Sequence, residues 1–378
     1  MDRKDIKDIF YKISSGTASA EEEQIAKYWL HYFHKDNVPE LSAAELDEES
    51  EQVFTALMKK HTVKSVGVKR LWYSAVAAAI LIITTSILFY YNHETNKPVN
   101  YSKVYDVAPG KKTATLTLAN GKRIVLSDVV NGQIAKQAGV SIFKTADGQL
   151  IYKIDPAVQK DAKDGYNSLT TSRAETYQVI LPDGSKVWLN AATSIKYPST
   201  FSKFKKRVIE LSGEAYLEIA KDEKHPFIVK TEQQEVEVLG THFNVSSYND
   251  DETTRTTIVE GSVRINVAKN VGGMLKPGQL GILNAGKLKV GPADIETELA
   301  WKNGFFRFDD ERLENIMKKI SRWYNIEVVY GNEALKNEPF AGVTTRFANV
   351  SALLRMLELT GEVKFKIEGR QIHVLNAK

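Results

Sequence analysis

The sequence predicts a multidomain chain: a small all-α bundle, one transmembrane helix, an antiparallel all-β domain and a C-terminal α+β domain of βαβ-βαββ-like order. Three observations predict this fold class. Residues 71–91 are an uncharged apolar run, residues 1–69 have helical periodicity, and strand patterns with hairpin turns dominate after residue 101. The 378 residues leave room for two or three domains.

Residues 1–69 carry three short amphipathic patterns. The second follows Ser19, which with Glu22 resembles a capping box. Its apolar stripe consists of Ile25, Trp29, Tyr32 and Phe33. Two interpretations stay open: a self-contained bundle whose stripes face one another, or a surface that awaits a partner helix.

Residues 71–91 have the length and composition of a membrane span. About 21 residues at roughly 1.5 Å each give roughly 31 Å, close to the hydrocarbon thickness of a bilayer. Aromatic residues stand at both ends: Trp72, Tyr73, Tyr90 and Tyr91. The alternative is a buried core helix, but such helices are usually shorter. We therefore expect a transmembrane helix over residues 70–92.

The charges on either side of this run predict its orientation. Only one basic residue, Lys97, follows the run closely. Five basic residues precede it: Lys59, Lys60, Lys64, Lys69 and Arg70. Basic flanks stay in the cytoplasm. Residues 1–69 are therefore predicted to be cytoplasmic, residues 93–100 to be a linker, and the chain beyond to lie outside the cytoplasm.

Composition excludes several kinds of site. A net charge of +4 is mild for this length and does not indicate nucleic-acid binding, and the absence of cysteine excludes disulfides and thiolate sites. His31 and His34 are three residues apart but have no third ligand nearby. No glycine-rich loop joins a strand to a helix. We expect no metal and no cofactor.

Hairpin turns mark the predicted β domain, residues 101–296. Asn120-Gly121 separates two strand patterns, and Asp183-Gly184 repeats this arrangement 63 residues later. Asp147-Gly148 and Ala285-Gly286 predict further turns.

Strands and helices alternate in the last region, residues 297–378. A strand at 305–308 precedes a helix capped by Asp309 or Asp310, whose buried face would be Leu313, Ile316, Met317, Ile320 and Trp323. A second helix would be capped by Asn349 or Ser351 and stopped by Gly361. A final hairpin turns at Gly369.

A series of motifs keeps its order over roughly residues 170–300: the run at 177–191, Tyr197-Pro198 with Phe201, and the motifs at 211–216, 226–227, 238–245, 259–263, 275–279 and 301–304. These motifs resemble those of FecR-family anti-sigma factors. The C-terminal region resembles the extra domain of Bacteroidetes-type members, which is similar to the short N-terminal fold of secretins and TonB-dependent receptors.

The resemblance implies a signalling role. Such proteins cross the inner membrane of Gram-negative bacteria once, with a cytoplasmic N-terminus and a periplasmic C-terminus. Their periplasmic part senses the signalling domain of a TonB-dependent outer-membrane receptor, and their cytoplasmic part holds an ECF-type sigma factor. The sigma-binding residues predicted here are Ile25, Trp29, Tyr32 and Phe33.

The pair Gly240-Thr241 carries the one chemical hypothesis. Some FecR-like proteins are similar here and cleave themselves before the threonine by an N→O acyl shift, in which the hydroxyl attacks the preceding carbonyl. Glycine leaves that carbonyl unshielded. Alternatively, Gly240 shapes a turn and Thr241 pairs in a strand. His242 should point to the opposite face from Thr241, because adjacent strand residues alternate.

Two functions stay open. The first is the anti-sigma relay, which has no enzymatic activity apart from self-cleavage at Gly240-Thr241. The alternative is a membrane-anchored envelope or glycan-binding module without a sigma partner.

Overall fold

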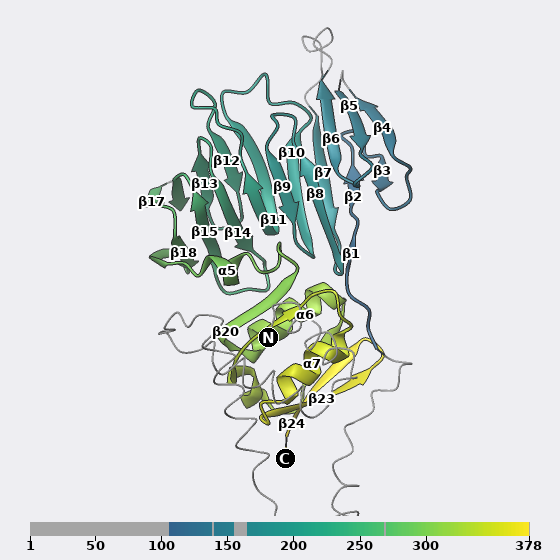
Figure 1. Ribbon diagram of the computed structural model, residues 1–378. Helices are drawn as coiled ribbons and strands as arrows, with labels where there is room; N and C mark the ends of the chain where they lie inside the picture. Colours follow the sequence, from purple (N-terminus) through teal and green to yellow (C-terminus); the bar gives the residue numbers. More distant parts are fainter. Residues whose placement is uncertain (1–105, 138–139, 155–164, 268–269, 378) are drawn as a thin grey trace, which may run out of the picture. The chain divides into compact units, whose positions relative to one another are not determined.

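The computed structural model describes residues 106–137, 140–154, 165–267 and 270–377 (Figure 1). Residues Ser102–Lys378 form one compact unit. The segments predicted to be a helical bundle (1–69), a membrane span (70–92) and a linker (93–100) lie outside the described residues.

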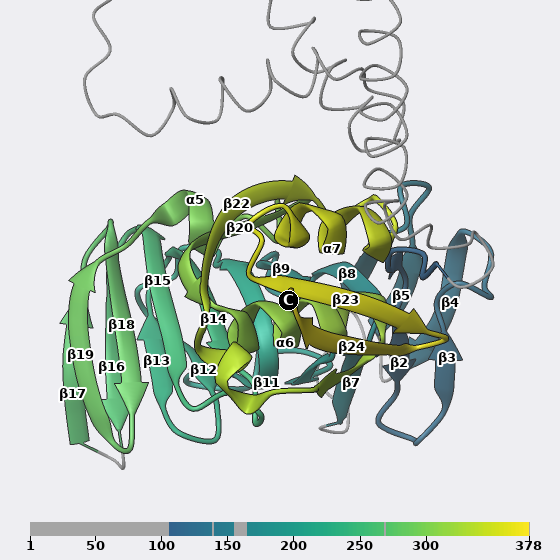
Figure 2. The same cartoon turned by 90° about the horizontal axis from the view of Figure 1, so that it is seen from below.

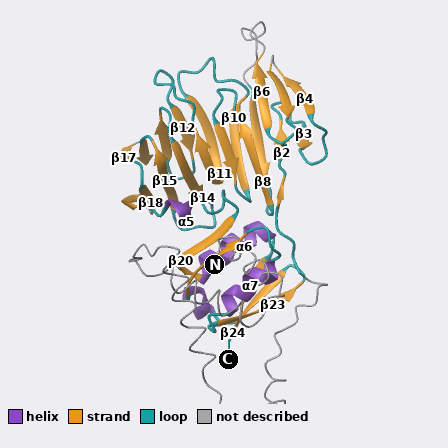
Figure 3. Ribbon diagram, in the orientation of Figure 1, coloured by secondary structure: helices purple, strands orange, loops and turns teal. Residues whose placement is uncertain are grey.

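The predicted fold class is wrong in its helical share. Of the described residues, 51% lie in strands and 12% in helices. Figure 3 shows the strands in orange and the helices in purple. The described residues contain three α-helices, and none of these is long and apolar enough to cross a membrane. The predicted bundle and membrane span would have supplied most of the helical share, and both lie outside the described residues.

Strands β2 to β19 form two sheets that pack face to face as a sandwich. The first sheet has the order β3-β2-β7-β10-β11-β12-β13-β16-β17. Its strands are β2 (Thr115–Thr117), β3 (Arg123–Val125), β7 (Tyr166–Thr171), β10 (Thr193–Pro198), β11 (Arg207–Glu218), β12 (Phe227–Lys230), β13 (Glu235–Val238), β16 (Val263–Val267) and β17 (Asn270–Leu275).

The second sheet has the order β4-β5-β6-β8-β9-β11-β14-β15-β18-β19. Its further strands are β4 (Gly132–Gln137), β5 (Val140–Lys144), β6 (Leu150–Ile154), β8 (Glu175–Ile180), β9 (Lys186–Leu189), β14 (His242–Ser247), β15 (Thr254–Glu260), β18 (Gln279–Asn284) and β19 (Lys287–Pro292). The short β1 (Lys111–Lys112) adds to β8 in parallel, as do β6 to β8 and β12 to β11; the other pairs in the sandwich are antiparallel.

Strand β11 belongs to both sheets. Its first half pairs with β10 and β12, and its second half, from Gly213 on, pairs with β14 and β9. Alternate residues of both sheets point inward and form one apolar core, with Leu116, Leu169, Phe227 and Phe243 fully buried.

Three hairpins of the sandwich share one turn geometry. In the predicted hairpin β2–β3, Gly121 N donates to Leu118 O at 2.8 Å, and Leu118 N donates to Lys122 O at 2.9 Å. The same two bonds recur around Gly148 and Gly184. Only the glycine of each turn has a positive φ (78–85°), so these are three-residue turns with a bulge.

The C-terminal part contains two small sheets, three helical segments and its own core. Its elements are β20 (Phe305–Arg312), α6 (Leu313–Tyr324), β21 (Glu327–Tyr330), the 3₁₀ helix η1 (Glu333–Asn337), β22 (Pro339–Thr345), α7 (Val350–Glu358), β23 (Val363–Glu368) and β24 (Gln371–Asn376). Figure 2 labels its helices α6 and α7 and its strands β20, β22, β23 and β24. The predicted apolar face of α6 is confirmed as buried. Helix α5 (Ile295–Glu298) spans the predicted boundary at residues 296 and 297, and the domain boundaries stay a prediction.

The predicted cap of α6 is wrong, and the predicted cap of α7 is confirmed only in its position. Asp309 and Asp310 lie in a bulge of β20, and Arg312 is the N-cap of α6 without a side-chain bond. Asn349 is the N-cap of α7, but its side chain makes no capping bond either. Strand β20 runs further than its apolar residues indicated, because β22 pairs with it on both sides of the bulge.

Candidate functional site

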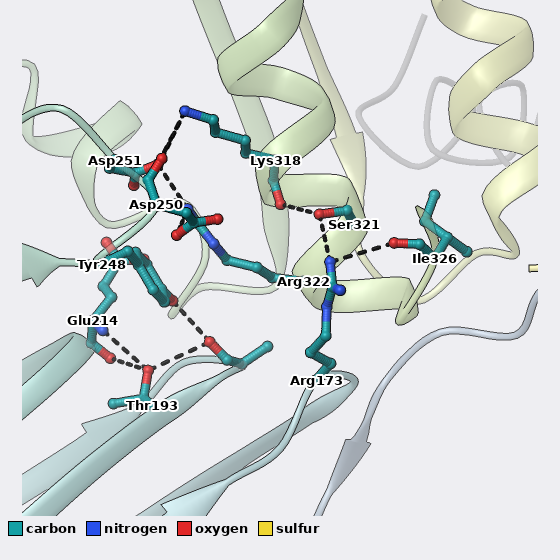
Figure 4. Close-up of polar contacts among 11 residues, drawn as sticks. Arg173, Thr193, Glu214, Tyr248, Asp250, Asp251, Lys318, Ser321, Arg322 and Ile326 are labelled. Carbon is teal, nitrogen blue, oxygen red and sulfur yellow. Dashed lines mark hydrogen bonds and ion pairs between the residues drawn. The ribbon is translucent and has the colours of Figure 1, made fainter. Parts of the chain in front are cut away.

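Polar residues gather where the sandwich meets the C-terminal part, and we call this region the junction. The sandwich contributes Asn190, Glu214, Tyr248, Asp250 and Asp251. The C-terminal part contributes Arg322 from the last turn of α6 and Arg346 from the residue after β22. Figure 4 shows the half of the junction around Arg322.

Arg322 binds the loop that follows β14. Its Nη2 lies 2.7 Å from Oδ1 of both Asp250 and Asp251, and its guanidinium stacks 3.7 Å from the ring centre of Tyr248 (Figure 4). Burial by itself lowers the pKa of Arg322, but the bonds to the two aspartates outweigh it and raise the pKa. Burial also raises the pKa of Tyr248, whose hydroxyl donates to Ala191 O at 2.8 Å.

A turn between β7 and β8 holds the other side of α6. Arg173 Nη2 donates to Ser321 Oγ at 2.8 Å and to Ile326 O at 3.3 Å (Figure 4). Ala174 N donates to Arg322 O at 2.8 Å. Helix α6 is therefore bound to the sandwich from two loops that are more than 70 residues apart in sequence.

A network of buried polar groups crosses the junction. Asn190 Nδ2 donates to Glu214 Oε2 at 2.7 Å, and Asn190 Oδ1 accepts from Arg346 Nη2 at 2.9 Å. Asn244 Nδ2 donates to the other carboxylate oxygen of Glu214 at 3.0 Å, and Asn244 Oδ1 accepts from Trp301 Nε1. Every amide orientation in this network is fixed by a partner on each side.

Arg346 is a buried cation, only 3% exposed. Its Nη1 donates to Trp301 O at 2.8 Å, and its guanidinium lies 4.0 Å from the ring centre of Trp323. Burial lowers the pKa of Arg346 to about 10, so the side chain stays charged at neutral pH. Burial also raises the pKa of Glu214 above its ordinary value, against the lowering effect of Asn244 and Asn190.

A cavity of about 480 Å³ opens at the junction, lined among others by Glu214, Arg255, Lys319, Arg322 and Arg346. Its walls carry charges of both signs, and most are already paired, as Arg255 is with Glu298 and Lys319 with Glu311. Among the described residues, no group of three histidines or acids could hold a metal ion. Paired charges, shared amides and stacked rings of this kind hold two structural parts together.

The structure places Gly240 and Thr241 just before β14. Thr241 is 2% exposed, and its hydroxyl donates to Ser262 O at 3.1 Å. A Cβ on Gly240 would lie 2.8 Å from Lys221 Cα, so close packing by itself requires glycine here. These contacts fit a structural role, and self-cleavage stays a prediction.

The predicted orientation of His242 is confirmed. Its ring pairs with Glu260 on the partly exposed face, at 3.0 Å, while Thr241 is buried. The predicted sigma-binding residues Ile25, Trp29, Tyr32 and Phe33 lie outside the described residues.

Sequence reasoning missed the junction. Arg322 and its aspartates are about 71 positions apart, and Arg346 and Asn190 are 156 apart. No spacing rule connects such residues. The one available signal was that Arg322 stands beside the apolar face of α6, where a cation requires a partner.

Two family models match the chain in the order of its two parts. The model described as "FecR protein" matches residues 167–264, and "FecR, C-terminal" matches residues 305–374. No curated protein matches the chain.

Two crystal structures of a candidate anti-sigma factor from Parabacteroides distasonis ATCC 8503 are similar to this chain. Both have 29% sequence identity and a TM-score of 0.52. The matches cover 56% and 55% of this chain, and 99% and 98% of the other.

Proposed function

Because this chain belongs to the FecR family of anti-sigma factors, we propose that it regulates a sigma factor. One observation carries the proposal: both FecR domains match, in order, within a single compact unit. The likeness to a candidate anti-sigma factor over nearly its whole length supports the same role.

In the finer proposal, the chain relays a signal from a TonB-dependent outer-membrane receptor to an ECF-type sigma factor. The charge asymmetry around residues 71–91 supports an inner-membrane protein that crosses once, with its N-terminus in the cytoplasm and residues 106–377 in the periplasm. The sigma factor would then meet residues 1–69, and the receptor would meet the sandwich or the C-terminal part.

The junction supports a relay rather than two independent modules. Arg173, Arg322 and Arg346 tie the C-terminal part to the sandwich by buried or half-buried bonds. A partner that binds either the sandwich or the C-terminal part therefore also affects the other part.

Capture of the full chain from its native host, followed by mass spectrometry, tests the proposal. We expect an ECF-type sigma factor to be recovered, and residues 1–69 alone to recover it as well. Trp29→Ala should weaken that binding by roughly 2–4 kcal/mol if the ring is an interface anchor. Circular dichroism of the variant fragment must match the unsubstituted fragment.

Failure to recover any sigma factor with either the full chain or residues 1–69 would contradict the function. Unchanged affinity of a folded Trp29→Ala fragment would remove only that residue from the site.

A further inference from the structure

The described chain begins with a segment that is bound to the C-terminal part, although the sandwich follows it in sequence. We call residues 106–110 the entry segment. The Asp106 carboxylate accepts hydrogen bonds from Ser351 N at 3.1 Å and from Ser351 Oγ at 2.7 Å. Val107 O accepts from Val350 N at 3.0 Å. All three bonds end on the first turn of α7.

These bonds give α7 the N-cap that its own sequence does not supply. The side chain of Asn349 makes no capping bond, and the first turn of the helix contains no acidic residue. The first N–H groups of a helix lack intrahelical partners, and a carboxylate there also interacts favourably with the helix dipole. Asp106, 245 residues earlier, fills both roles.

The entry segment also contributes to the apolar core of the C-terminal part. Val107 is 7% exposed and belongs to the same cluster as Trp323, Val350 and Leu353. At Gly110 a Cβ would lie 2.7 Å from the Trp323 ring and 2.8 Å from Ala174 O, so only glycine fits.

The sandwich holds the next residues less firmly. Lys111 N donates to Ala174 O at 2.8 Å, and β1 then pairs with β8 over two residues whose side chains are both exposed. The chain that leads back to residues 1–105 is therefore fixed mainly by α7 and its core.

We propose that the entry segment is a releasable latch that couples the C-terminal part to the chain leading to residues 1–105. A partner protein that shifts α7 breaks the hydrogen bonds between Asp106 and Ser351 and removes the core contacts of Val107 at the same time. The entry segment is therefore released as a unit. By reciprocity, release of the segment loosens α7 to the same extent. The regulatory meaning of the latch rests on the proposed relay function, whereas the coupling itself does not.

Amide hydrogen exchange on the purified full chain tests the coupling. Asp106→Ala should raise exchange about fivefold in both the entry segment and α7, the typical effect of losing an N-cap. Asp106→Asn keeps an acceptor for Ser351 N and should stay within about twofold of the unsubstituted chain. Leu353→Ala, in the core of the C-terminal part, should raise exchange in the entry segment.

Asp294→Ala is the matched control. Asp294 caps α5 through Glu296 N and Thr297 N, so this variant also loses a helix cap but leaves the latch intact. Its exchange at residues 106–110 and 350–358 should equal that of the unsubstituted chain. Faster exchange confined to residues 106–110 in Asp106→Ala, with α7 unchanged, would overturn the latch.

Transcription in the native host separates the latch from the proposed function. Two variants are compared: Asp106→Ala and a deletion of residues 301–378. Both should change the basal expression of genes that depend on the captured sigma factor, and both in the same direction. Asp294→Ala should have no such effect. Faster exchange with unchanged transcription would overturn the regulatory role, whereas failure to capture a sigma factor would contradict the proposed function and leave the exchange result to decide the coupling.

Discussion

Arg322 joins α6 to the loop that follows β14. Its side chain is 8% exposed and bonds two aspartates and a tyrosine ring. Arg322→Ala leaves Asp251 without its main partner and removes the stacking on Tyr248. We expect the free energy of unfolding of residues 102–378 to fall by about 2–3 kcal/mol in denaturant titrations.

Two variants check this prediction. Arg322→Lys keeps the charge that faces the two aspartates but loses the planar guanidinium that stacks on Tyr248, so it should lower the free energy of unfolding by about half as much. Glu223→Ala removes an ion pair with Lys221, in which the side chain of Lys221 is 78% exposed and that of Glu223 is 69% exposed. It should change the free energy of unfolding by less than about 0.5 kcal/mol. Equal effects of Arg322→Ala and Glu223→Ala would mean that the contacts of Arg322 add no stability.

Glu214 makes stability depend on pH. Its pKa is raised by burial, so the folded state binds the proton more tightly than the unfolded state. The contribution of Glu214 to the free energy of unfolding therefore falls as pH rises from the ordinary carboxylate pKa through the raised one.

Glu214→Gln should remove this component of the pH dependence, measured as unfolding free energy between about pH 4 and pH 8. Glutamine cannot replace the carboxylate fully, because Asn190 and Asn244 both present N–H donors and their oxygens are already bonded. Parallel pH profiles for the variant and the unsubstituted protein would show that Glu214 does not titrate in this range.

At the scale of elements, β11 decides how the two sheets are joined. Gly213, where the strand passes from one sheet to the other, has φ +102°, and a Cβ there would lie 2.5 Å from Thr193 Oγ1 and 2.8 Å from Ala192 O. Gly213→Ala combines backbone strain with overpacking. It should lower the free energy of unfolding by roughly 3 kcal/mol or more, measured by thermal or denaturant unfolding.

Gly291→Ala is the control for this strand variant. Gly291 lies in β19, and a Cβ there meets no atom within 4 Å. We expect Gly291→Ala to change the free energy of unfolding by less than about 1 kcal/mol. A Gly213→Ala protein as stable as Gly291→Ala would mean that β11 can cross between the sheets with a side chain at this position.

At the scale of the whole molecule, the proposed topology has a direct test. A reporter that is active only in the cytoplasm should give signal when fused to the N-terminus and none when fused after residue 378. The reason is the excess of lysine and arginine before residues 71–91. Signal from the C-terminal fusion alone would reverse the orientation and exclude the proposed relay.

Local patterns by themselves determined much of the described fold. The turns at Gly121, Gly148 and Gly184, and the buried face of α6, could be predicted because glycine conformation and helical periodicity depend on residues a few positions apart. The FecR motifs likewise pointed to the family through contiguous runs of sequence.

Tertiary structure alone decided the junction and the entry segment. Asp106 caps a helix 245 residues away, and Arg346 completes a buried network with Asn190. The cap predicted for α6 is wrong, because β20 continues through a bulge. Asn349 is the N-cap of α7 as predicted, but the capping hydrogen bonds come from the distant carboxylate of Asp106. Such contacts depend on which surfaces the whole chain brings together, and the buried groups there find partners by distance in space rather than by spacing in sequence.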